Sequence, residues 1–448
     1  MRKKWLYFFI VLVAIVVVLY VLRYKQSQVF ENRVPAGATK IVNINLRQIE
    51  NHLLFDFLAN PITYLTPRKR KDSIKKERFS LFKSVSIPRN ILFYTNSEEL
   101  KNNWFSTRVK VKDEGELSNY LLKEKFVQST EGNVIIYSKA NFILAIKNEQ
   151  LIISIKVDKK ADINPALISL FDTEDFLAED TEILKPLVNN NSDISFTSSN
   201  ETLQANFRDG IFELQGTLTS NLFVTNNNIM PDEEDVISIS GKVNKDNTVF
   251  NKFWTDKKDK FNEITHLSLD SIVQKWNGKL NFNITSIEQK TDTIVSYEYD
   301  DDFNKVEIKS TQEKKIPVLG LILGQENPSS LSDYFYGKNA IQVIENDTVF
   351  TTIPIFKFLA TDAKDNLELR VNQKRTTPNP SSSSKLKFYF NVKKYMETPL
   401  DIPLSKDQEE LLKLVKATKL EWAKDNQFTL KINLLDESRN FLGQLIKQ

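Results

Sequence analysis

Residues 40–49, KIVNINLRQI, are matched near the other end of the chain by residues 386–395, LKFYFNVKKY. In both stretches apolar side chains alternate with polar ones, which predicts a strand with one buried face. Asn45 and Asn391 hold the same place in the two patterns, and a basic residue, Arg47 or Lys393, follows two positions later. A helix is expected after each strand, so the two stretches predict one repeated unit.

The match continues into a second pair of strands. Residues 105–114, FSTRVKVKDE, and 428–437, FTLKINLLDE, both end in Asp-Glu before an expected helix, and ILFYT (91–95) corresponds to KLEWA (419–423). Each end segment therefore has the order β-α-β-β-α, the start of a split βαβ unit. We predict an α+β fold in which an N-terminal transmembrane helix precedes mainly antiparallel sheets, with split-βαβ (ferredoxin-like) units at both ends of the exported region. A duplication explains the match, and coincidence between two simple patterns is the alternative.

Four regions follow from this interpretation. They are a transmembrane anchor (1–25), an N-terminal α+β domain (34–190), a β-rich middle domain (191–375) and a C-terminal β-α-β-β-α unit (385–448). The last unit is a candidate to pack on the N-terminal domain. The stretch TTPNPSSSS, residues 376–384, has the composition of a linker.

Two hairpins and a meander are predicted from turn residues between alternating strands. Asp209-Gly210 suits a tight turn that needs positive φ. A second hairpin is expected over residues 142–156, FILAIKNEQLIISIK, and a meander over 279–309 with a charged turn at 300–302. The short apolar run VLGLIL, residues 318–323, predicts a buried strand or a packed loop.

Helices are expected in four places. The first spans Arg47 to Ala59, and the second starts at Asp113, with Glu116 placed as in a capping box and Leu117 and Leu121 buried. Residues 162–187 are expected to hold two short helices that break near Asp172. The last helix should start at Asp436 and place Phe441, Leu442, Leu445 and Ile446 on one face.

Residues 5–22, WLYFFIVLVAIVVVLYVL, contain no charge, proline or glycine. About 18 apolar residues at ~1.5 Å each cover roughly 27 Å, close to the hydrocarbon thickness of a bilayer. Trp5, Tyr7, Tyr20 and Tyr24 are placed to mark the two interfaces. We predict an uncleaved single-pass anchor in the inner (cytoplasmic) membrane, since no small-residue cleavage site follows the run, as a cleaved signal peptide would require. The positive residues before the run favour a cytoplasmic N-terminus and a periplasmic or extracytoplasmic remainder.

Composition limits the class of protein. The 448 residues are 41% hydrophobic and 27% charged, with a net charge of +3. This balance is typical of globular domains and disfavours a nucleic acid as partner. The chain has no cysteine, so disulfides, thiolate catalysis and Cys-ligated zinc are excluded.

Common catalytic signatures are missing from the sequence. The two histidines, His52 and His266, stand alone, and neither a phosphate-binding glycine loop nor a GxSxG nucleophile motif is present. We expect no catalytic residue, no cofactor and no metal ligand. Chemistry by carboxylates alone stays open, with Glu298, Asp300 and Asp302 near a predicted turn as candidates. An ordinary solvated turn is the alternative.

A basic run, PRKRKDSIKKER at residues 67–78, is the strongest charge feature. It is a candidate for contact with an anionic surface, either lipid headgroups or an acidic protein. A solvated loop is the alternative. Its cations are Arg68, Lys69, Arg70, Lys71, Lys75, Lys76 and Arg78.

The chain resembles uncharacterised single-pass envelope proteins of Bacteroidota. The stretches concerned are VPAGATKIVNINLRQIE (34–50), FYFNVKKY (388–395) and KINLLDESRNFLGQLIK (431–447). Val34-Pro35-Ala36 and Asn45 match the opening pattern of those proteins, and Asn440 falls in the closing helix. The resemblance implies a location and an architecture, and it implies no activity.

Three functions are compatible with the sequence. The first is a membrane-anchored, non-catalytic scaffold or accessory subunit for another envelope protein, held in the lipid bilayer through residues 5–22. The second is binding or transfer of an apolar ligand such as a lipid, which requires a continuous apolar cavity. The third is a carboxylate-dependent enzyme on envelope glycans, which requires two acidic groups roughly 5–10 Å apart in a cleft.

Overall fold

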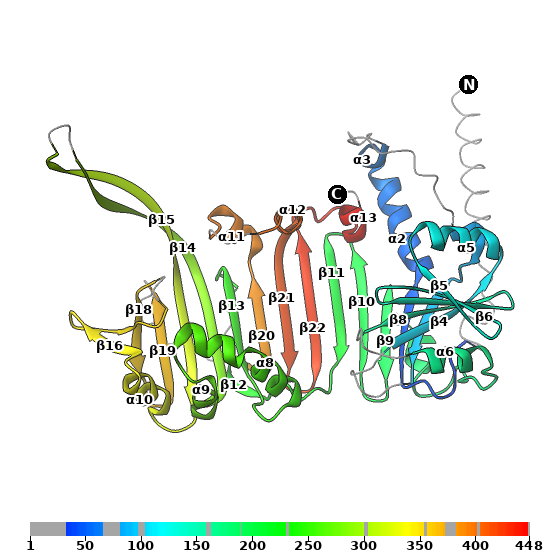
Figure 1. Ribbon diagram of the computed structural model, residues 1–448, viewed down its shortest axis with the longest axis horizontal. Helices are drawn as coiled ribbons and strands as arrows, with labels where there is room; N and C mark the ends of the chain where they lie inside the picture. The colour runs from blue at the N-terminus through cyan, green and yellow to red at the C-terminus, as the bar shows by residue number, and fades with distance from the viewer. Residues whose placement is uncertain are drawn as a thin grey trace. The chain divides into compact units, whose positions relative to one another are not determined.

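The computed structural model describes residues 33–65, 81–96, 104–157, 163–188, 190–229, 233–299, 303–353, 356–371, 382–400 and 404–446. The chain divides into two compact units, one ending at Asn206 and one running from Phe207 to Ile446. The structure is rich in strands, with 46% strand and 27% helix, and its sheets are mostly antiparallel. Figure 1 shows the elements of both units.

The first unit is built on one antiparallel sheet. Along the sheet, neighbouring strands are hydrogen-bonded pairs. In spatial order they are β5 (Val127–Glu131), β6 (Val134–Lys139), β7 (Phe142–Lys147), β8 (Gln150–Lys156), β4 (Trp104–Val111), β3 (Asn90–Thr95), β1 (Lys40–Asn45), β9 (Ile194–Ser198) and β10 (Thr202–Arg208).

Helices cover both faces of this sheet. On one face α5 (Glu114–Lys123) buries Leu117 and Leu121 against β4, β7 and β8. On the other face α6 (Asn164–Phe171) and α7 (Lys185–Val188) close a second apolar cluster. Figure 1 shows α5 and α6 on opposite sides of the strands. The remaining helices are α2 (Leu46–Ala59), α3 (Pro61–Leu65) and α4 (Leu81–Ser84).

The second unit also has one antiparallel sheet. Its strands, in spatial order, are β11 (Ile211–Thr217), β22 (Gln427–Leu434), β21 (Val415–Ala423), β20 (Ser382–Phe390), β13 (Ile237–Lys242), β14 (Trp276–Tyr299), β15 (Lys305–Gln325), β19 (Asn366–Val371), β18 (Phe358–Asp362), β17 (Asp347–Phe350) and β16 (Ile341–Ile344). The short β12 (Asn226–Ile229) pairs with the start of β20.

The second sheet has one apolar and one polar face. The strand registers align a row of apolar side chains across it: Leu214, Leu430, Leu420, Phe388, Ile239, Phe282, Leu321 and Leu369. The opposite face carries cross-strand ion pairs such as Lys431–Glu213 at 2.8 Å. This alternation is typical of antiparallel sheets with one solvated face.

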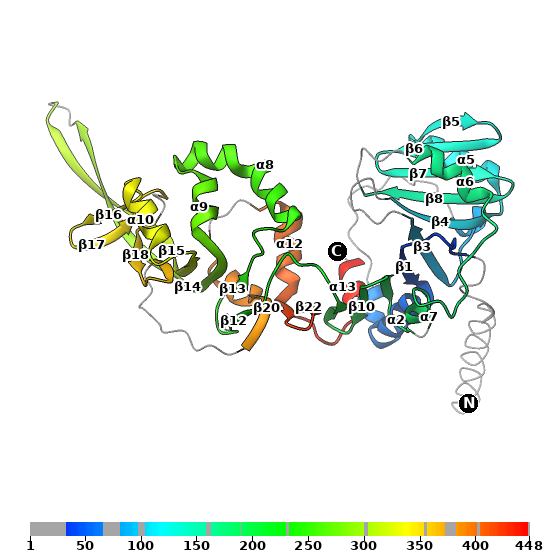
Figure 2. The ribbon, with the colours of Figure 1, turned by 90° about the horizontal axis from the view of Figure 1, so that it is seen from below.

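Helices of the second unit pack mainly against the apolar face. α8 (Thr248–Thr265), α9 (Leu269–Lys275) and α10 (Ser330–Gly337) close the largest apolar cluster, and Figure 2 shows α8 and α9 on one side of β13 and β14. α11 (Val392–Glu397), α12 (Lys406–Leu414) and α13 (Phe441–Ile446) close a second cluster with the ends of β20, β21 and β22.

The repeated corner predicted from residues 40–49 and 386–395 is present in both units. Asn45 caps α2 by accepting a hydrogen bond from the Gln48 amide, and Asn391 caps α11 by accepting one from the Lys394 amide. The backbone angles of the two asparagines agree closely, φ −84° and ψ 83° against φ −82° and ψ 87°. The backbone amide of Asn45 donates to the Asp193 carbonyl, and that of Asn391 donates to the Val236 carbonyl, both at 2.8 Å. Each of these carbonyls belongs to the residue just before the neighbouring strand.

The predicted ferredoxin-like units are wrong. In a split βαβ unit the two strands joined by the first helix run parallel and have another strand between them. Here β1 and β3 are adjacent and antiparallel, and so are β20 and β21. The far edge of β1 is occupied by β9 and that of β20 by β13, so each helix returns the chain to the neighbouring strand. The apolar periodicity of the sequence identified the strands and helices, whereas the direction and order of the strands depend on partners that are distant in the chain.

The predicted fold class also included a transmembrane helix, and the structure does not support it. Residues 5–22, with Trp5, Tyr7, Tyr20 and Tyr24, lie outside the described residues. Among the helices that are described, none combines the length and the apolar character needed to cross a bilayer.

Most local predictions are confirmed. The second hairpin is β7–β8, whose turn residues Asn148 and Glu149 both have positive φ, as a tight two-residue hairpin turn requires. Residues 318–323 lie within β15. Two predictions needed correction: the 279–309 region is one long hairpin rather than a meander, and α13 starts at Phe441 rather than near Asp436, with Ile446 64% exposed.

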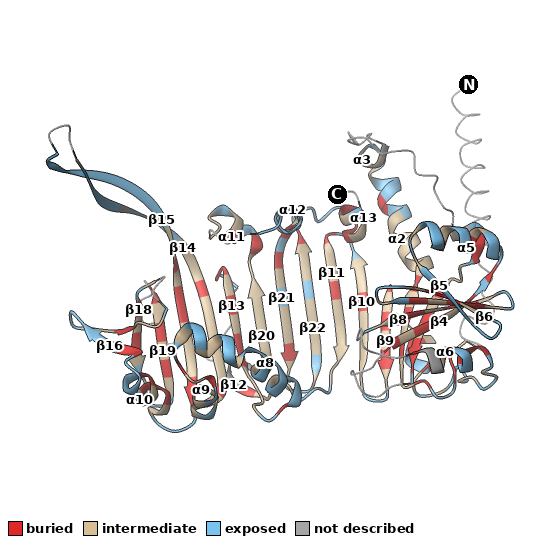
Figure 3. Cartoon of the chain, in the orientation of Figure 1, coloured by how far each residue is buried: buried red, intermediate tan, exposed pale blue. Residues whose placement is uncertain are grey.

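The long hairpin β14–β15 extends beyond the neighbouring strands. Its pairing runs from Trp276↔Gln325 to Tyr299↔Lys305, whereas β13 pairs only with residues 279–284 and β19 only with residues 319–324. Figure 3 shows the distal part as exposed. The expected charged turn at residues 300–302 lies outside the described residues.

Candidate ligand-binding site

Helix α5 is fixed at its start by side chains. Asp113 accepts a hydrogen bond from the Glu116 amide at 2.8 Å, as the sequence predicts for an N-cap. Ser84 donates to the Glu116 carboxylate at 3.0 Å, which ties the first turn of α5 to the end of α4. The start of the helix is therefore held beside β2 (Val85–Ser86).

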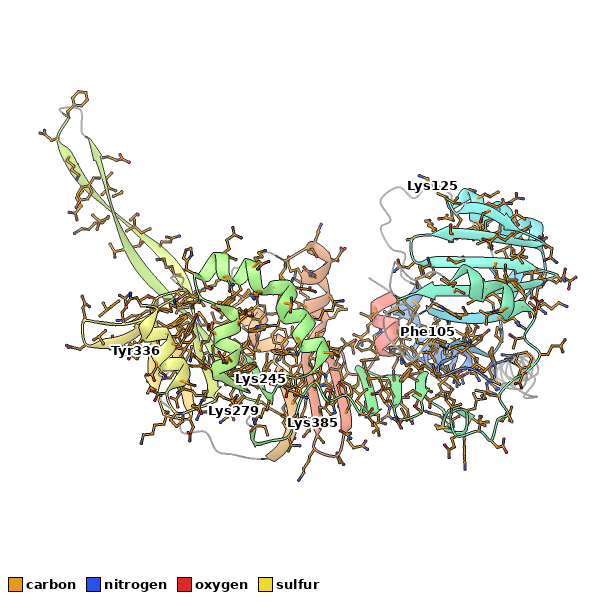
Figure 4. All side chains as sticks on the ribbon, turned by 60° about the horizontal axis from the view of Figure 1, so that its bottom comes forward. Phe105, Lys125, Lys245, Lys279, Tyr336 and Lys385 are labelled. Atoms are coloured by element: carbon orange, nitrogen blue, oxygen red, sulfur yellow. The ribbon has the colours of Figure 1, made fainter. Side chains whose placement is uncertain are left out.

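The end of α5 is closed by a Schellman turn. Lys125, labelled in Figure 4, has φ +65°, a conformation usually taken by glycine at this position. The Lys125 amide donates to the Leu122 carbonyl, and the Phe126 amide donates to the Leu121 carbonyl, both at 3.0 Å. The turn directs Phe126 back toward Leu121, so the aromatic ring belongs to the apolar cluster beneath the helix.

The sheet beneath α5 has a gap between β3 and β4. Ser86 of β2 pairs with Lys110 of β4, and Tyr94 of β3 pairs with Ser106 of the same strand. Residues 87–93 therefore face only residues 107–109. The extra backbone cannot stay in the ladder, so β3 leaves β4 here, while the other edge of β3 stays paired with β1 along its whole length.

An apolar cavity of about 310 Å³ lies between α5 and this part of the sheet. Its walls come from α5, β3, β4, β7, β8 and the segment before β3. They are lined by Val85, Ile87, Pro88, Ile91, Phe93, Thr107, Val109, Leu117, Tyr120, Leu121, Glu124, Phe126, Leu144, Leu151 and Ile153. Thirteen of these side chains, apart from Thr107 and Glu124, are hydrocarbon, aromatic or proline, so the cavity favours an apolar occupant. Phe105, labelled in Figure 4, precedes Thr107 and Val109 on the same face of β4 but is not one of the lining residues.

A second, cationic hollow of about 460 Å³ shares Pro88 and Val109 with the cavity. Arg33, Arg108 and Lys110 contribute its positive charges, and Glu149 is the one carboxylate among its lining residues. Lys110 lies 3.4 Å from the Glu149 carboxylate, with both side chains well exposed. Because side chains alternate along a strand, Arg108 and Lys110 point to the opposite face of β4 from Thr107 and Val109.

The two arginines are held by carbonyl and aromatic groups. Arg33 donates through Nη1 to the Asn90 carbonyl at 3.2 Å, and burial lowers the pKa of its guanidinium. Arg108 donates through Nη2 to the Leu170 carbonyl, and its guanidinium lies 5.8 Å from the centre of the Phe176 ring. Within the described residues neither guanidinium forms an ion pair with a carboxylate. Both keep charge available to an anion.

A very small cavity of about 10 Å³ lies in the gap itself. It is lined by Arg33, Pro88, Asn90, Leu92, Thr107 and Arg108, and so it shares residues with both larger hollows. Asn90 is 6% exposed, and its side-chain oxygen has no hydrogen-bond partner among the described residues. A buried amide oxygen without a partner costs on the order of 1–3 kcal/mol, so in this orientation it favours a hydrogen-bond donor in the gap.

The site residues named from sequence are not among these groups. The basic candidates Arg68, Lys69, Arg70, Lys71, Lys75, Lys76 and Arg78 lie outside the described residues. Of the three candidate carboxylates, Glu298 is exposed on the distal part of β14, and Asp300 and Asp302 are not described. Glu124 and Glu149 line different hollows, so the described site offers no close carboxylate pair in one cleft.

His52 has a more specific environment than the sequence indicated. Its Nε2 lies 3.3 Å from an oxygen of Asp193, whose side chain is fully buried, and the His52 side chain is 30% exposed. The Asp193 carbonyl also accepts from the Asn45 amide. The pair thus joins α2 to the residue before β9. His266 instead ends α8, with φ +56°.

Arg33, Pro88 and Arg108 were missed by sequence reasoning. Arg108 falls on the polar side of the alternating strand 105–111, where the sequence does not distinguish a binding cation from an ordinary solvated one. The one available signal was Pro88, which interrupts an otherwise strand-like stretch and cannot donate a hydrogen bond within a sheet.

Comparison with known proteins adds no identification. No protein-family model matches the chain, and no curated protein matches it. Crystal form III of TP0453 aligns with 10% identity and a TM-score of 0.25 over 41% of this chain and 79% of that one. Crystal form I aligns with 9% identity and a TM-score of 0.23 over 76% and 93%. At these scores the likeness supports no conclusion about fold or function.

Proposed function

We propose that the first unit binds the hydrocarbon chain of an apolar ligand in the cavity beneath α5. The observation that carries this proposal is the cavity of about 310 Å³ with its largely apolar walls. Such volumes lie at the lower end of the range for small-molecule sites. An engineered apolar cavity of about 150 Å³ holds benzene, so about twice that volume corresponds to a chain of on the order of ten carbon atoms.

The expected affinity follows from the buried chain. Each CH₂ group transferred from water contributes about 0.8 kcal/mol. A chain of about ten carbons gains roughly 8 kcal/mol before the entropic losses of association, so Kd should be micromolar or weaker. Affinity should rise about fourfold per CH₂ and level off near ten carbons, where the cavity is full.

The test is a calorimetric titration of the purified full-length chain with linear alcohols from hexan-1-ol to dodecan-1-ol. The structure offers a matched pair of variants, because Ile91, Ile44 and Ile194 form one cross-strand row. Ile91 lines the cavity and Ile194 does not, although both are half-buried on the same face of the sheet.

Ile91→Trp should fill the cavity and weaken decan-1-ol binding at least tenfold. Ile194→Trp should leave the affinity within about twofold of the unmodified chain. Equal binding by the two variants, or no binding of any alcohol by the unmodified chain, would contradict the proposal.

A protein partner is the second candidate function, and the distal part of β14–β15 supports it. An isolated two-stranded ribbon is marginally stable in water, and no third strand pairs with residues 288–299 or 305–315 in the described parts of the chain. Exposed apolar side chains, including Val295, Tyr297 and Ile308, lie on it. Strand addition by another protein would cover these groups.

The test for this second function is in-cell crosslinking followed by affinity purification. Val295→Lys together with Ile308→Lys should remove a stoichiometric partner. Thr291→Lys with Gln312→Lys, polar positions on the same ribbon, should retain it. A purified protein that yields no reproducible partner in any form would contradict this function.

A further inference from the structure

The gap between β3 and β4 lies beside both the apolar cavity and the cationic hollow. The small cavity in the gap shares Pro88 and Thr107 with the apolar cavity, and it shares Arg33 and Arg108 with the cationic hollow. An amphiphilic molecule with its chain beneath α5 and its end group in the gap would place that end group next to two guanidinium groups.

We propose that the ligand is a long-chain carboxylate whose head group lies in the gap, between Arg33, Arg108 and the Asn90 side chain. This inference rests on the proposed function, since it concerns the other end of the same ligand. To the apolar chain of the proposed function, the inference adds a small, negatively charged head group.

The size of the gap limits the head group. A volume of about 10 Å³ is close to that of one water-sized probe. A carboxylate oxygen fits this space, whereas a bulky head group would have to displace Pro88 or Leu92 from the walls.

Charge and hydrogen bonding favour the ionised form. Two half-buried guanidinium groups, which have no carboxylate partner among the described residues, provide donors in the planar geometry that suits a carboxylate. The Asn90 side-chain oxygen is the unpaired atom of this amide, and an oxygen cannot donate to an anion. The amide can turn by about 180°, which presents its NH₂ group to the carboxylate instead.

The test compares decanoate with decan-1-ol on the full-length chain at pH 7.5 and low salt. Hydrogen bonds to charged groups contribute roughly 1.5–3 kcal/mol, so decanoate should bind at least tenfold more tightly. Arg33→Gln should remove most of this preference while the affinity for decan-1-ol stays within about twofold. Arg33→Lys, which keeps the charge, should retain part of the preference.

Lys110→Gln is the matched control. Lys110 lines the same hollow but is well exposed and paired with Glu149, so its loss should leave the preference for decanoate nearly unchanged. Equal affinity for decanoate and decan-1-ol in the unmodified chain would overturn the carboxylate inference and leave the cavity function standing. Failure of both ligands to bind would instead remove the proposed function itself.

Discussion

The two asparagine corners are nearly identical, yet the sheets that continue from them differ. In the second unit β21 and β22 pair continuously from Val415↔Leu434 to Trp422↔Phe428, with one irregularity near Val415. In the first unit the corresponding strands, β3 and β4, pair only at Tyr94↔Ser106. The residues between β2 and β3 have left the ladder, and cavities occupy the space. The candidate site thus lies in the unit in which the strands after the asparagine corner lack regular pairing.

The largest expected effect concerns the packing around the two copies. Leu434 is fully buried in the cluster beneath α13, and Leu121 is buried beside the cavity under α5. Leu434→Ala should lower the free energy of unfolding by about 4 kcal/mol, within the range for solid cores, and Leu121→Ala by about 2–3 kcal/mol because fewer contacts are lost. Denaturant unfolding followed by hydrogen exchange in each unit measures both. Equal losses would show that the first copy is packed as tightly as the second.

The next comparison is between two turn glycines with positive φ, Gly210 and Gly132. Gly210 has φ +63°, and a Cβ there would lie 2.6 Å from Glu437 Cα. Gly132 has φ +59° and open space around it. Gly132→Ala should cost about 1–2 kcal/mol, the price of the left-handed conformation alone. Gly210→Ala should cost at least about 1 kcal/mol more, because backbone atoms must move. Thermal unfolding of the two variants provides the comparison, and a smaller loss at Gly210 would show that the corner near Asp436 is not rigid.

The two asparagine caps should contribute equally. Asn45→Ala and Asn391→Ala each remove one helix cap, so each should lower stability by about 1 kcal/mol. The two values should agree within about 0.5 kcal/mol if the corners are true equivalents. Asn433→Ala, on β22, is a control for asparagine loss outside a cap and should change stability by less than about 0.5 kcal/mol. Clearly unequal values for the two caps would break the equivalence.

The smallest effect is a gain in stability at the end of α5. Lys125→Gly should stabilise the first unit by about 1 kcal/mol, because glycine adopts φ +65° without strain. Lys123→Gly, inside the last turn of the same helix, should instead destabilise it by about 1 kcal/mol. Denaturation midpoints measure both changes. If Lys125→Gly lowered the stability, the contacts of the Lys125 side chain would stabilise the unit by more than the strained backbone destabilises it.

The sequence predicted local structure well and long-range pairing poorly. Asp113 was predicted to start a helix with Glu116 in a capping-box position, whereas Asn45 and Asn391 were matched in sequence and the structure assigns them as caps. The antiparallel placement of β1 beside β3 was not predictable, because it depends on β9, about 150 residues away in the chain. Helix α8 was missed because most of its residues are polar and none of its side chains is fully buried, although its apolar residues do follow a helical period.

The candidate binding site was the least predictable part. It arises from a mismatch in register, with residues 87–93 set against 107–109, and register is not visible in a single strand. Arg33 and Arg108 meet there from segments about 75 residues apart. Pro88 alone marked the interruption, without indicating that an apolar space lies on one side and a cationic one on the other.

The most direct test of the central claim is to find where a bound alkyl chain lies. Decan-1-ol carrying a diazirine near its end would be equilibrated with the full-length chain, photolysed, and the modified residues located by peptide mass spectrometry. The cavity predicts adducts on α5 and the turn after it, between Leu117 and Phe126, and on the facing strands near Leu144 and Ile153, and it predicts their loss in Ile91→Trp. Adducts confined to other surfaces, or unchanged by Ile91→Trp, would show that the space beneath α5 is not a ligand site.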